Sequence, residues 1–379
     1  MGEDTFITKL RWNLPWLVRY PFVRARALLE ATAFEHKHIV ITVADHFEPG
    51  WSSGGVLDHR TQMKRLDAYR KMAREIGNSV SDADGTKFRH TNFYPAEQYH
   101  PEILDVLAEM QEEGLGEVEV HLHHGVDRPD TAENLERQLV EFRDTIAERH
   151  RCLSRWHGGG APMYAFVHGN LALANSCGGK YCGVDDEMAI LRDTGCYADF
   201  TLPSAPDRTQ VAMINMIYEY GGDPKQAVPH AVGRRFSVNG TEPQLPLIFT
   251  GPLIFDLSRV RPRIDDGSLT AALGSGVGRL KRWASANITV EGRSDVIFIK
   301  LYCHGFFDHD QQACIGEDAK RLFGEMVEGA ARTGKQTIHF ASAREAFNMA
   351  VAISEGFTGD PHLYRDHHLQ TIMSEGKGA

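Results

Sequence analysis

The sequence predicts an α/β fold with a mainly parallel sheet of the barrel type. From residue 38 onward, short runs rich in β-branched residues alternate with longer stretches of helical periodicity, which is the pattern of strands joined by crossover helices. The length of 379 residues suits one enlarged α/β domain, or a core with an insertion. We therefore expect one domain over residues 38–355, an N-terminal segment over 1–37 and a polar, loosely held tail over 356–379.

The composition is that of an ordinary globular protein, with 42% hydrophobic and 24% charged residues. A net charge of −10 without a basic block argues against a nucleic-acid-binding protein. The six cysteines form no CxxC pair, which favours reduced thiols and a cytoplasmic setting over a disulfide framework. The sequence has neither a signal-peptide pattern nor an apolar run of about 18 residues.

The segment 12–33 mixes large apolar residues with arginines, and two interpretations of it stay open. It can lie on an anionic membrane surface, which would give the protein a peripheral membrane contact. It can also form an N-terminal helix packed on the body of the protein. Pro15 and Pro21 interrupt a long amphipathic helix, so the packed arrangement is favoured.

Seven runs are predicted to be strands, because each is short, apolar and bounded by polar or glycine-rich sequence. These strands cover residues 38–44, 87–94, 116–124, 164–168, 197–201, 296–302 and 337–340.

Seven helices are predicted from apolar residues at helical spacing, as with Met63, Leu66 and Tyr69 in the first of them. They cover residues 58–75, 102–113, 131–149, 185–194, 268–286, 318–333 and 343–355. The second helix stops at Gly114, where glycine takes the left-handed cap conformation. Prolines crowd residues 202–292, so we expect this segment to be an irregular insertion or lid.

The most informative stretch runs from Gly116 to His124 and reads GEVEVHLHH. Alternation along a strand places its polar side chains on one face and its apolar side chains on the other. The polar row is Glu117, Glu119, His121 and His123. Imidazole is the commonest metal ligand, and two imidazoles on one face need only one or two oxygen donors to complete a site. The stretch predicts metal binding, against the alternative of a histidine cluster satisfied within the core.

Polar side chains also follow other predicted strands. Asp45, His46 and Glu48 come at the end of the first strand. His168 and His304 each end a strand just before a glycine, which permits a tight turn and a close backbone approach. Because ligand sites of α/β folds collect at the carboxyl ends of parallel strands, these ends together form the strongest composite signal.

Three further residues are candidates for substrate binding. Tyr94 belongs to an aromatic stretch at the end of the second strand, which suits either a sugar ring or the core. Asn170 follows His168, and Asp207 lies in a loop that carries hydroxyl groups. A P-loop, a Rossmann glycine fingerprint and a GxSxG elbow are all absent, which excludes those mechanisms.

This order of features resembles the polysaccharide deacetylase family over about residues 38–352, with 202–292 as extra sequence. The family's first motif, a strand ending in paired aspartates, is similar to Thr42-Val-Ala-Asp-His46. Its run of proline, glutamate, helix, glycine, glutamate and histidine is similar to the stretch from His100-Pro-Glu to Glu117-Val-Glu-Val-His121. Its last two motifs are similar to His168-Gly-Asn170 and to Leu301–His304. The resemblance implies a distorted (β/α) barrel of the glycoside hydrolase and deacetylase type.

Carried over position by position, the resemblance implies that Asp45 and His121 bind the metal. The family's second metal histidine would fall on Gly125. His123 or His124 must therefore replace it, and strand geometry favours His123.

The same resemblance implies that His304 acts as a general acid, and that His168 orients the substrate or assists the acid. Ala44 stands where the family has its catalytic base, an aspartate. Another group would have to activate the water molecule. The candidates for that role are Glu48, His46 and Asp127.

The resemblance implies a hydrolase that depends on a divalent metal, with zinc as the expected ion. Its expected reaction removes an N- or O-acyl group from a carbohydrate or glycan-like substrate. Two alternatives remain. A pair such as His121 and His123 is also typical of metal-dependent hydrolases of the amidohydrolase or phosphoesterase type. The second alternative is a non-catalytic carbohydrate-binding relic, which fits Ala44 at the position of the family's catalytic base.

Overall fold

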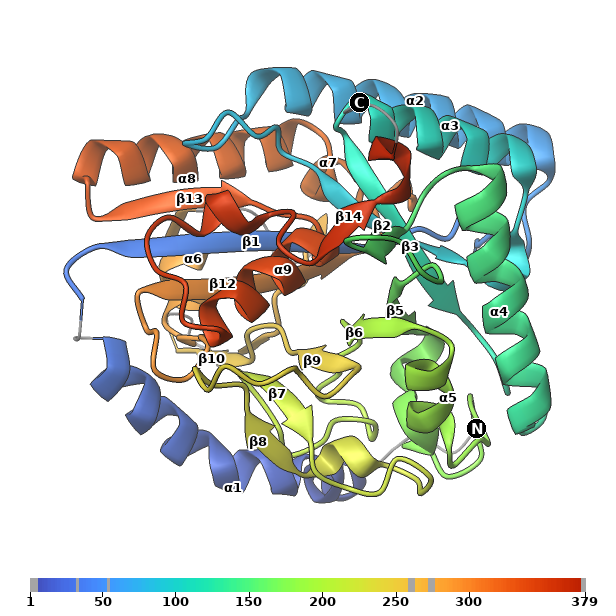
Figure 1. Cartoon of the computed structure of the whole chain (residues 1–379), viewed down its shortest axis with the longest axis horizontal. Coiled ribbons are helices and arrows are strands. Elements are labelled where there is room, and N and C mark those ends of the chain that lie inside the picture. The colour runs from blue at the N-terminus through green and yellow to red at the C-terminus, as the bar shows by residue number, and fades with distance from the viewer. Residues whose placement is uncertain (1–5, 32–33, 53–54, 258–262, 272–276, 376–379) are drawn as a thin grey trace.

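A mainly parallel sheet of ten strands organises the protein (Figure 1). The computed structural model describes residues 6–31, 34–52, 55–257, 263–271 and 277–375. The strands of this sheet are β1 Lys37–His46, β2 His90–Pro95, β3 Gly116–Leu122, β5 Tyr164–His168, β6 Cys196–Asp199, β7 Ile217–Tyr220, β8 Gly233–Arg235, β9 Leu247–Phe249, β12 Val296–Cys303 and β13 Gln336–Phe340. Their order is β12-β1-β2-β3-β5-β6-β9-β7-β8, and β13 also pairs with β1.

Most helices pack on the outer face of this sheet, and the last helix packs on its inner face. Their bounds are α1 Phe6–Ala31, α2 His59–Ser79, α3 Pro101–Glu112, α4 Ala132–Arg149, α5 Glu187–Asp193, α6 Val277–Ala284, α7 Gln311–Cys314, α8 Glu317–Thr333 and α9 Ala343–Ser354. Among the described residues, side chains cap the N-termini of three of these helices, because the first backbone N–H groups of a helix have no partner within it. Asp58 caps α2, Thr131 caps α4, and Ser342 with Glu345 forms a capping box on α9.

The pairing pattern is that of a distorted barrel. Every pair from β12 through β1, β2, β3, β5 and β6 to β9 is parallel, whereas β7 pairs antiparallel with both β9 and β8. Within the described residues, no strand pairing closes the sheet between β12 and β9. Instead, Lys300 of β12 donates a hydrogen bond to the carbonyl oxygen of Leu202 (2.9 Å). The predicted α/β barrel-type fold is confirmed.

Side chains of β1 alternate between two hydrophobic layers. Ile39, Ile41 and Val43 belong to the layer beneath the outer helices, whereas Val40 and Ala44 belong to the layer inside the sheet. Asp45 therefore falls on the helix side of β1, and the next residue, His46, falls on the inner side. This alternation decides which polar groups meet at the carboxyl end of the sheet.

Residues 202–292 are more closely integrated than a separate insertion or lid. They supply β7, β8 and β9 to the main sheet, and β9 pairs directly with β6. They also form the hairpin of β10 Ile254–Asp256 with β11 Arg263–Asp265. The strands were not predicted because each is only three or four residues long and lies between prolines, so no periodicity develops.

The C-terminal segment is also better anchored than predicted. Its strand β14 Leu369–Thr371 pairs with β4 Ser154–Trp156, and Leu369 is fully buried. The side chain of Asn348 on α9 accepts a hydrogen bond from the backbone N–H of Leu369 (2.9 Å). The expectation of a loosely held tail over 356–379 is wrong for the described residues up to 375.

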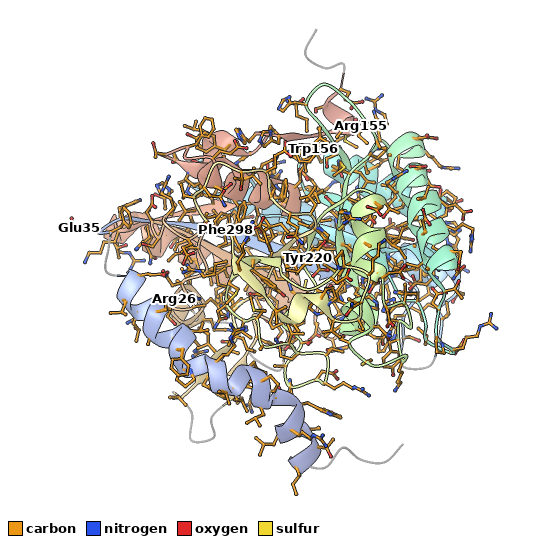
Figure 2. The ribbon with its side chains drawn as sticks, turned by 60° about the horizontal axis from the view of Figure 1, so that its bottom comes forward. Arg26, Glu35, Arg155, Trp156, Tyr220 and Phe298 are labelled. Atoms are coloured by element: carbon orange, nitrogen blue, oxygen red, sulfur yellow. The ribbon has the colours of Figure 1, made fainter. Side chains whose placement is uncertain are left out.

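The N-terminal segment forms one helix, α1, that continues through Pro15 and Pro21. Both prolines lie on the exposed face, where water can bind the carbonyl groups that they leave without partners. On the other face, Trp16 and Val23 pack against a small cluster from residues 205–253, so the packed arrangement is confirmed. Figure 2 shows α1 running along the outside of the body.

The exposed face of α1 carries Ile7, Leu14, Val18 and Phe22. Contact of this face with a membrane surface stays a prediction. Among the described residues, no helix has the length and apolar character needed to cross a bilayer.

We expect Trp16→Ala to lower the free energy of unfolding by about 3 kcal/mol, because the indole is buried and its removal leaves a cavity under α1. The indole N–H also donates to Asn13 (2.6 Å). Urea unfolding measures the effect. Phe22→Ala is the matched control: its ring is 75% exposed on the same helix, so stability should change little. Equal effects of the two substitutions would contradict the packing of α1 described above.

Candidate functional site

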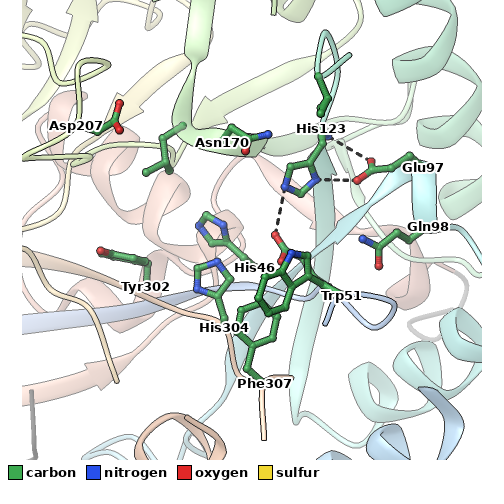
Figure 3. A pocket seen from close by; sticks show the side chains of 13 residues that line it. His46, Trp51, Glu97, Gln98, His123, Asn170, Asp207, Tyr302, His304 and Phe307 are labelled. Atoms are coloured by element: carbon green, nitrogen blue, oxygen red, sulfur yellow. Dashed lines mark hydrogen bonds and ion pairs between the residues drawn. The ribbon is translucent and has the colours of Figure 1, made fainter. Parts of the chain in front are cut away.

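A pocket of about 520 Å³ opens at the carboxyl ends of β1, β3 and β12 (Figure 3). Its lining residues come from these strand ends and from the loops that follow them. They are His46, Glu48, Trp51, Glu97, Gln98, His123, Val126, Asn170, Leu171, Asp207, Tyr302, His304 and Phe307. The volume is in the range typical of small-molecule sites.

Two imidazoles and one carboxylate converge at the base of this pocket. One ligand atom from each of His46, Glu48 and His121 lies within 4.8 Å of the others, and all three residues are buried. Glu48 Oε1 is 3.3 Å from His121 Nε2 and also 3.3 Å from His123 Nε2. The predicted face of β3 thus brings His121 and His123 to the same carboxylate.

The contacts of the imidazoles decide which ring nitrogens are directed at this group. His121 Nδ1 lies 2.7 Å from the carbonyl oxygen of Val167, which can only accept, so Nδ1–H donates and Nε2 is the ring nitrogen directed at Glu48. His46 Nε2 is buried without a hydrogen-bond partner. Two imidazoles and a carboxylate directed at one another form a set of donors that could hold a cation, and a second hydrogen bond like that of His121 Nδ1 is typical of metal-ligating histidines. The donor set fits a divalent metal such as zinc.

His123 has a different role in this group. Burial lowers its pKa, but the bonds to Glu48 and Glu97 outweigh burial and raise that pKa to about 9. Its Nδ1–H donates to Glu97 Oε1 (2.7 Å). His123 is therefore a cation held between two carboxylates, and it holds Glu48 in place. Burial also acts on Glu48, but the bonds from His121 and His123 keep the pKa of that carboxyl well below its usual value.

His304 lies beside this group on the loop after β12 (Figure 3). Its ring centroid is 4.8 Å from that of His46, and it stacks on Phe307 at 4.9 Å. Burial lowers the pKa of His304, so the ring is neutral near neutral pH. Burial, followed by the neighbouring His304 and His121, holds the pKa of His46 well below its ordinary value.

The structure does not bring Asp45 into the pocket, contrary to the expectation that it binds metal with His121. Its carboxylate accepts bonds from Tyr69 (3.0 Å) and from the backbone N–H of Gly305 (2.8 Å), and it lies 2.9 Å from His90 Nδ1. The reason is its position on the helix side of β1. Ala44 is buried in the inner layer and offers no polar atom.

His124 and His168 also lie away from the pocket lining. Their Nε2 atoms are 3.0 Å apart, next to Cys182 and Glu187 in a second buried cluster. The structure therefore does not bring His124 and His168 to the pocket with His121, and the predictions of His124 as a metal ligand and of His168 as a catalytic residue stay predictions. The strand ends at Leu122, so alternation no longer decides where His124 points.

Two of the three residues predicted to bind substrate line the pocket. Asn170 and Asp207 are exposed on its wall, whereas Tyr94 is buried in the core and its hydroxyl donates to the carbonyl oxygen of Gln98. Asp127, a candidate to activate water, is exposed and does not line the pocket.

Sequence reasoning missed the aromatic wall of the pocket. Trp51 stacks on Phe307, with ring centroids 4.3 Å apart. Trp51 is 45% exposed despite its size, and it lies in the loop that follows Glu48. A tryptophan so soon after a polar strand end could have indicated this aromatic wall from the sequence.

Glu119 shares the inner face of β3 with His121 but lies deeper in the sheet. It accepts hydrogen bonds from the Tyr197 hydroxyl (2.5 Å) and from the backbone N–H of Ala165 (2.6 Å). Burial outweighs these bonds and raises its pKa to about 8. Glu119 is therefore a structural carboxylic acid, and it belongs to the core.

We expect the raised pKa of Glu119 to make the free energy of unfolding fall with rising pH. The folded protein binds a proton at Glu119 that the unfolded chain loses near pH 4.5, so this stabilisation is present below that pH and is lost as pH rises toward about 8. Glu119→Gln should remove the decline, on the order of 1 kcal/mol per pH unit where it is steepest. Urea unfolding between about pH 5 and about pH 9 measures it.

Glu117→Gln is the matched control on the same face of β3. Glu117 pairs with buried Arg344 (2.8 Å), so its substitution should lower stability across the whole pH range. An unchanged pH slope in Glu119→Gln would contradict the assignment.

Comparisons with known proteins add one finding. No family model and no curated protein matches the chain. Among solved structures, the chain is similar to a GH57-type branching enzyme from the hyperthermophilic archaeon Pyrococcus horikoshii, at 9% sequence identity and a TM-score of 0.41. The match covers 86% of this chain and 71% of the other. A similarity at this level carries no inference about function.

Proposed function

We propose that this protein is a metal-dependent hydrolase that removes an acyl group from a carbohydrate-like substrate. The observation that carries the proposal is the convergence of His46, Glu48 and His121 at the base of an open pocket. The likeness of its strand-end motifs to polysaccharide deacetylases supports acyl-group hydrolysis among the reactions such a site can perform.

The residues that would hold the metal are His46, Glu48 and His121. Zinc bound by three protein ligands would polarise an acyl carbonyl group and lower the pKa of a water molecule. His121 is oriented for this role by its bond to the Val167 carbonyl oxygen, and Glu48 by its bond to His123. The open side of the pocket leaves room for the substrate.

His304 is the group that would move the proton. Because burial keeps it neutral, it can take a proton from the attacking water molecule. As an imidazolium it can then give that proton to the leaving nitrogen or oxygen atom. The C–N or C–O bond breaks, and the acyl group departs as a carboxylate. One residue would thus serve as base and as acid, which offsets the loss of an aspartate at position 44.

The pocket wall supports a sugar-like substrate. The stacked rings of Trp51 and Phe307 form an apolar surface beside the site, and Asn170 and Asp207 offer hydrogen-bonding groups on the wall. An apolar platform combined with a few polar groups suits a ring that carries hydroxyls.

Two substitutions separate metal binding from catalysis. We expect His121→Ala to lose the pocket metal and the activity together, because it removes a ligand. His304→Ala should keep the metal and lower kcat by about 10²–10⁴-fold, the usual contribution of a general acid or base. Elemental analysis measures the metal, and release of acetate from N-acetylated and O-acetylated sugars measures turnover. A wild type that holds metal and binds glycans without turnover would overturn the proposal in favour of a binding relic.

Asp45→Asn tests the ligand set that we assign. The resemblance to deacetylases makes Asp45 a metal ligand, whereas its contacts place it in a separate hydrogen-bond group. We expect the variant to keep the pocket metal and to lose about 1–3 kcal/mol of stability, because a buried acceptor of several bonds is altered. Loss of the metal without loss of stability would return Asp45 to the ligand set.

A further inference from the structure

Four potential metal ligands from four segments meet in the interior, away from the lining of the pocket. His124 follows β3, His168 ends β5, Cys182 lies in the loop after β5, and Glu187 begins α5. One ligand atom of each lies within 4.8 Å of the others. His124 is 4% exposed, and the other three are fully buried. We propose that this cluster is a second metal site, structural in kind and suited to zinc.

The hydrogen bonds around the cluster direct three ligand atoms at one another. His168 Nδ1–H donates to the carbonyl oxygen of Gly169, so His168 Nε2 carries a lone pair. His124 Nδ1–H donates to Asp130 Oδ2 (3.1 Å), which leaves His124 Nε2 toward the centre. That atom lies 3.0 Å from His168 Nε2 and 3.0 Å from Glu187 Oε1.

Cys182 and Glu187 complete the same arrangement. Glu187 uses its other oxygen, Oε2, to accept the backbone N–H of Ala174, so Oε1 stays directed at the two imidazoles. The sulfur of Cys182 accepts the N–H of Val184 at 3.5 Å. A single proton would bridge one pair of atoms, whereas a metal ion would bind all four.

The surrounding groups are those that metal ligands usually have. Each imidazole donates its second ring N–H to a carboxylate or to a backbone carbonyl group, which fixes the ring and its tautomer. Asp130 is itself held, because it accepts a bond from Asn134 (2.7 Å) and its backbone N–H donates to the Cys182 carbonyl oxygen (2.8 Å).

The backbone is shaped so that Cys182 can reach His124. A Cβ atom on Gly125 would lie 2.1 Å from the Cys182 carbonyl oxygen, and Gly125 has φ +64°, a conformation that favours glycine. The N–H of Tyr181 donates to the Gly125 carbonyl oxygen (2.9 Å). These contacts hold the loop that carries Cys182 against the end of β3.

The chemistry of the donors identifies the class of ion. One thiolate, two imidazoles and one carboxylate form a four-ligand set that suits zinc and disfavours magnesium and calcium. All four ligands come from the protein and are buried, so no position is left for substrate. Such a closed site stabilises structure, and here it would fix the segment that carries Asn170 and Leu171 to the pocket wall.

The cluster of Asp45, His90 and Cys303 differs from this proposed metal site. Its groups also lie close together and are buried. However, the hydroxyl of Tyr69 and the backbone N–H of Gly305 satisfy Asp45, and His90 Nε2–H donates to the Cys314 carbonyl oxygen (3.0 Å). Asp45 and His90 thus each have hydrogen-bond partners, and we assign no metal to that cluster.

Cobalt substitution of the full-length protein tests the second site directly. A thiolate bound to Co²⁺ gives an intense near-ultraviolet charge-transfer band, and the pocket donors His46, Glu48 and His121 include no sulfur. We expect this band in the wild type and in Cys177→Ser, a control cysteine that is buried in the same loop. Cys182→Ser should lose the band together with one metal ion per chain.

Two measurements keep the test decisive if Cys182→Ser does not fold. X-ray absorption at the zinc edge of the wild type should show sulfur at ~2.3 Å. Chelation of the wild type should lower its Tm by on the order of 5 °C. Bound metal without a sulfur ligand, or no bound metal at all, would overturn the second site.

The outcomes also separate this inference from the proposed function. His121→Ala should lose the pocket metal and keep the cobalt–thiolate band. Loss of activity in His121→Ala with an intact band supports both sites. An intact band without any hydrolytic activity in the wild type would overturn the proposed function alone.

Discussion

Side-chain alternation along the parallel strands is the constraint on which the candidate site depends. On β1 it turns Asp45 toward the outer helices and His46 toward the interior. On β3 it turns His121 inward, and the register of β3 with β5 sets His121 opposite Val167. The Val167 carbonyl oxygen can then bind His121 Nδ1 and leave Nε2 to face Glu48. A shift of one residue in either strand would reverse these faces.

The sequence predicted the site to the extent that each strand reveals its two faces. In β3, polar and apolar residues alternate, so the inward position of His121 and His123 could be read from the pattern. In β1, both faces are apolar because both are buried, so the pattern does not say which face Asp45 joins. The prediction for Asp45 rested on its place at the strand end and on the resemblance, whereas the structure directs its carboxylate to Tyr69 and Gly305 on the helix side. Most helices and the main strands were predicted, because their periodicity extends over several turns or pairs.

The parts that could not be predicted depend on contacts between distant irregular segments. Cys182 and Glu187 reach His124 through a loop in which Ala174, Asn175 and Tyr181 take left-handed conformations, and no local pattern specifies such a path. Gly169, which follows His168, could have indicated a close contact between segments from the sequence. A Cβ atom on Gly169 would meet the His123 ring at 2.4 Å, so this glycine lets the two histidine-bearing segments touch.

The adjacent residues His123 and His124 belong to two different sites. His123 lines the pocket and binds Glu48 and Glu97, whereas His124 turns into the sealed cluster. A donor set that opens on a pocket can admit water and substrate, and a sealed one cannot. The proposed hydrolysis would therefore take place at the group around His46, and the sealed cluster would act only by holding the pocket wall in shape. Two histidines of one sequence motif would thus serve chemistry and architecture separately, which a count of histidines alone could not distinguish.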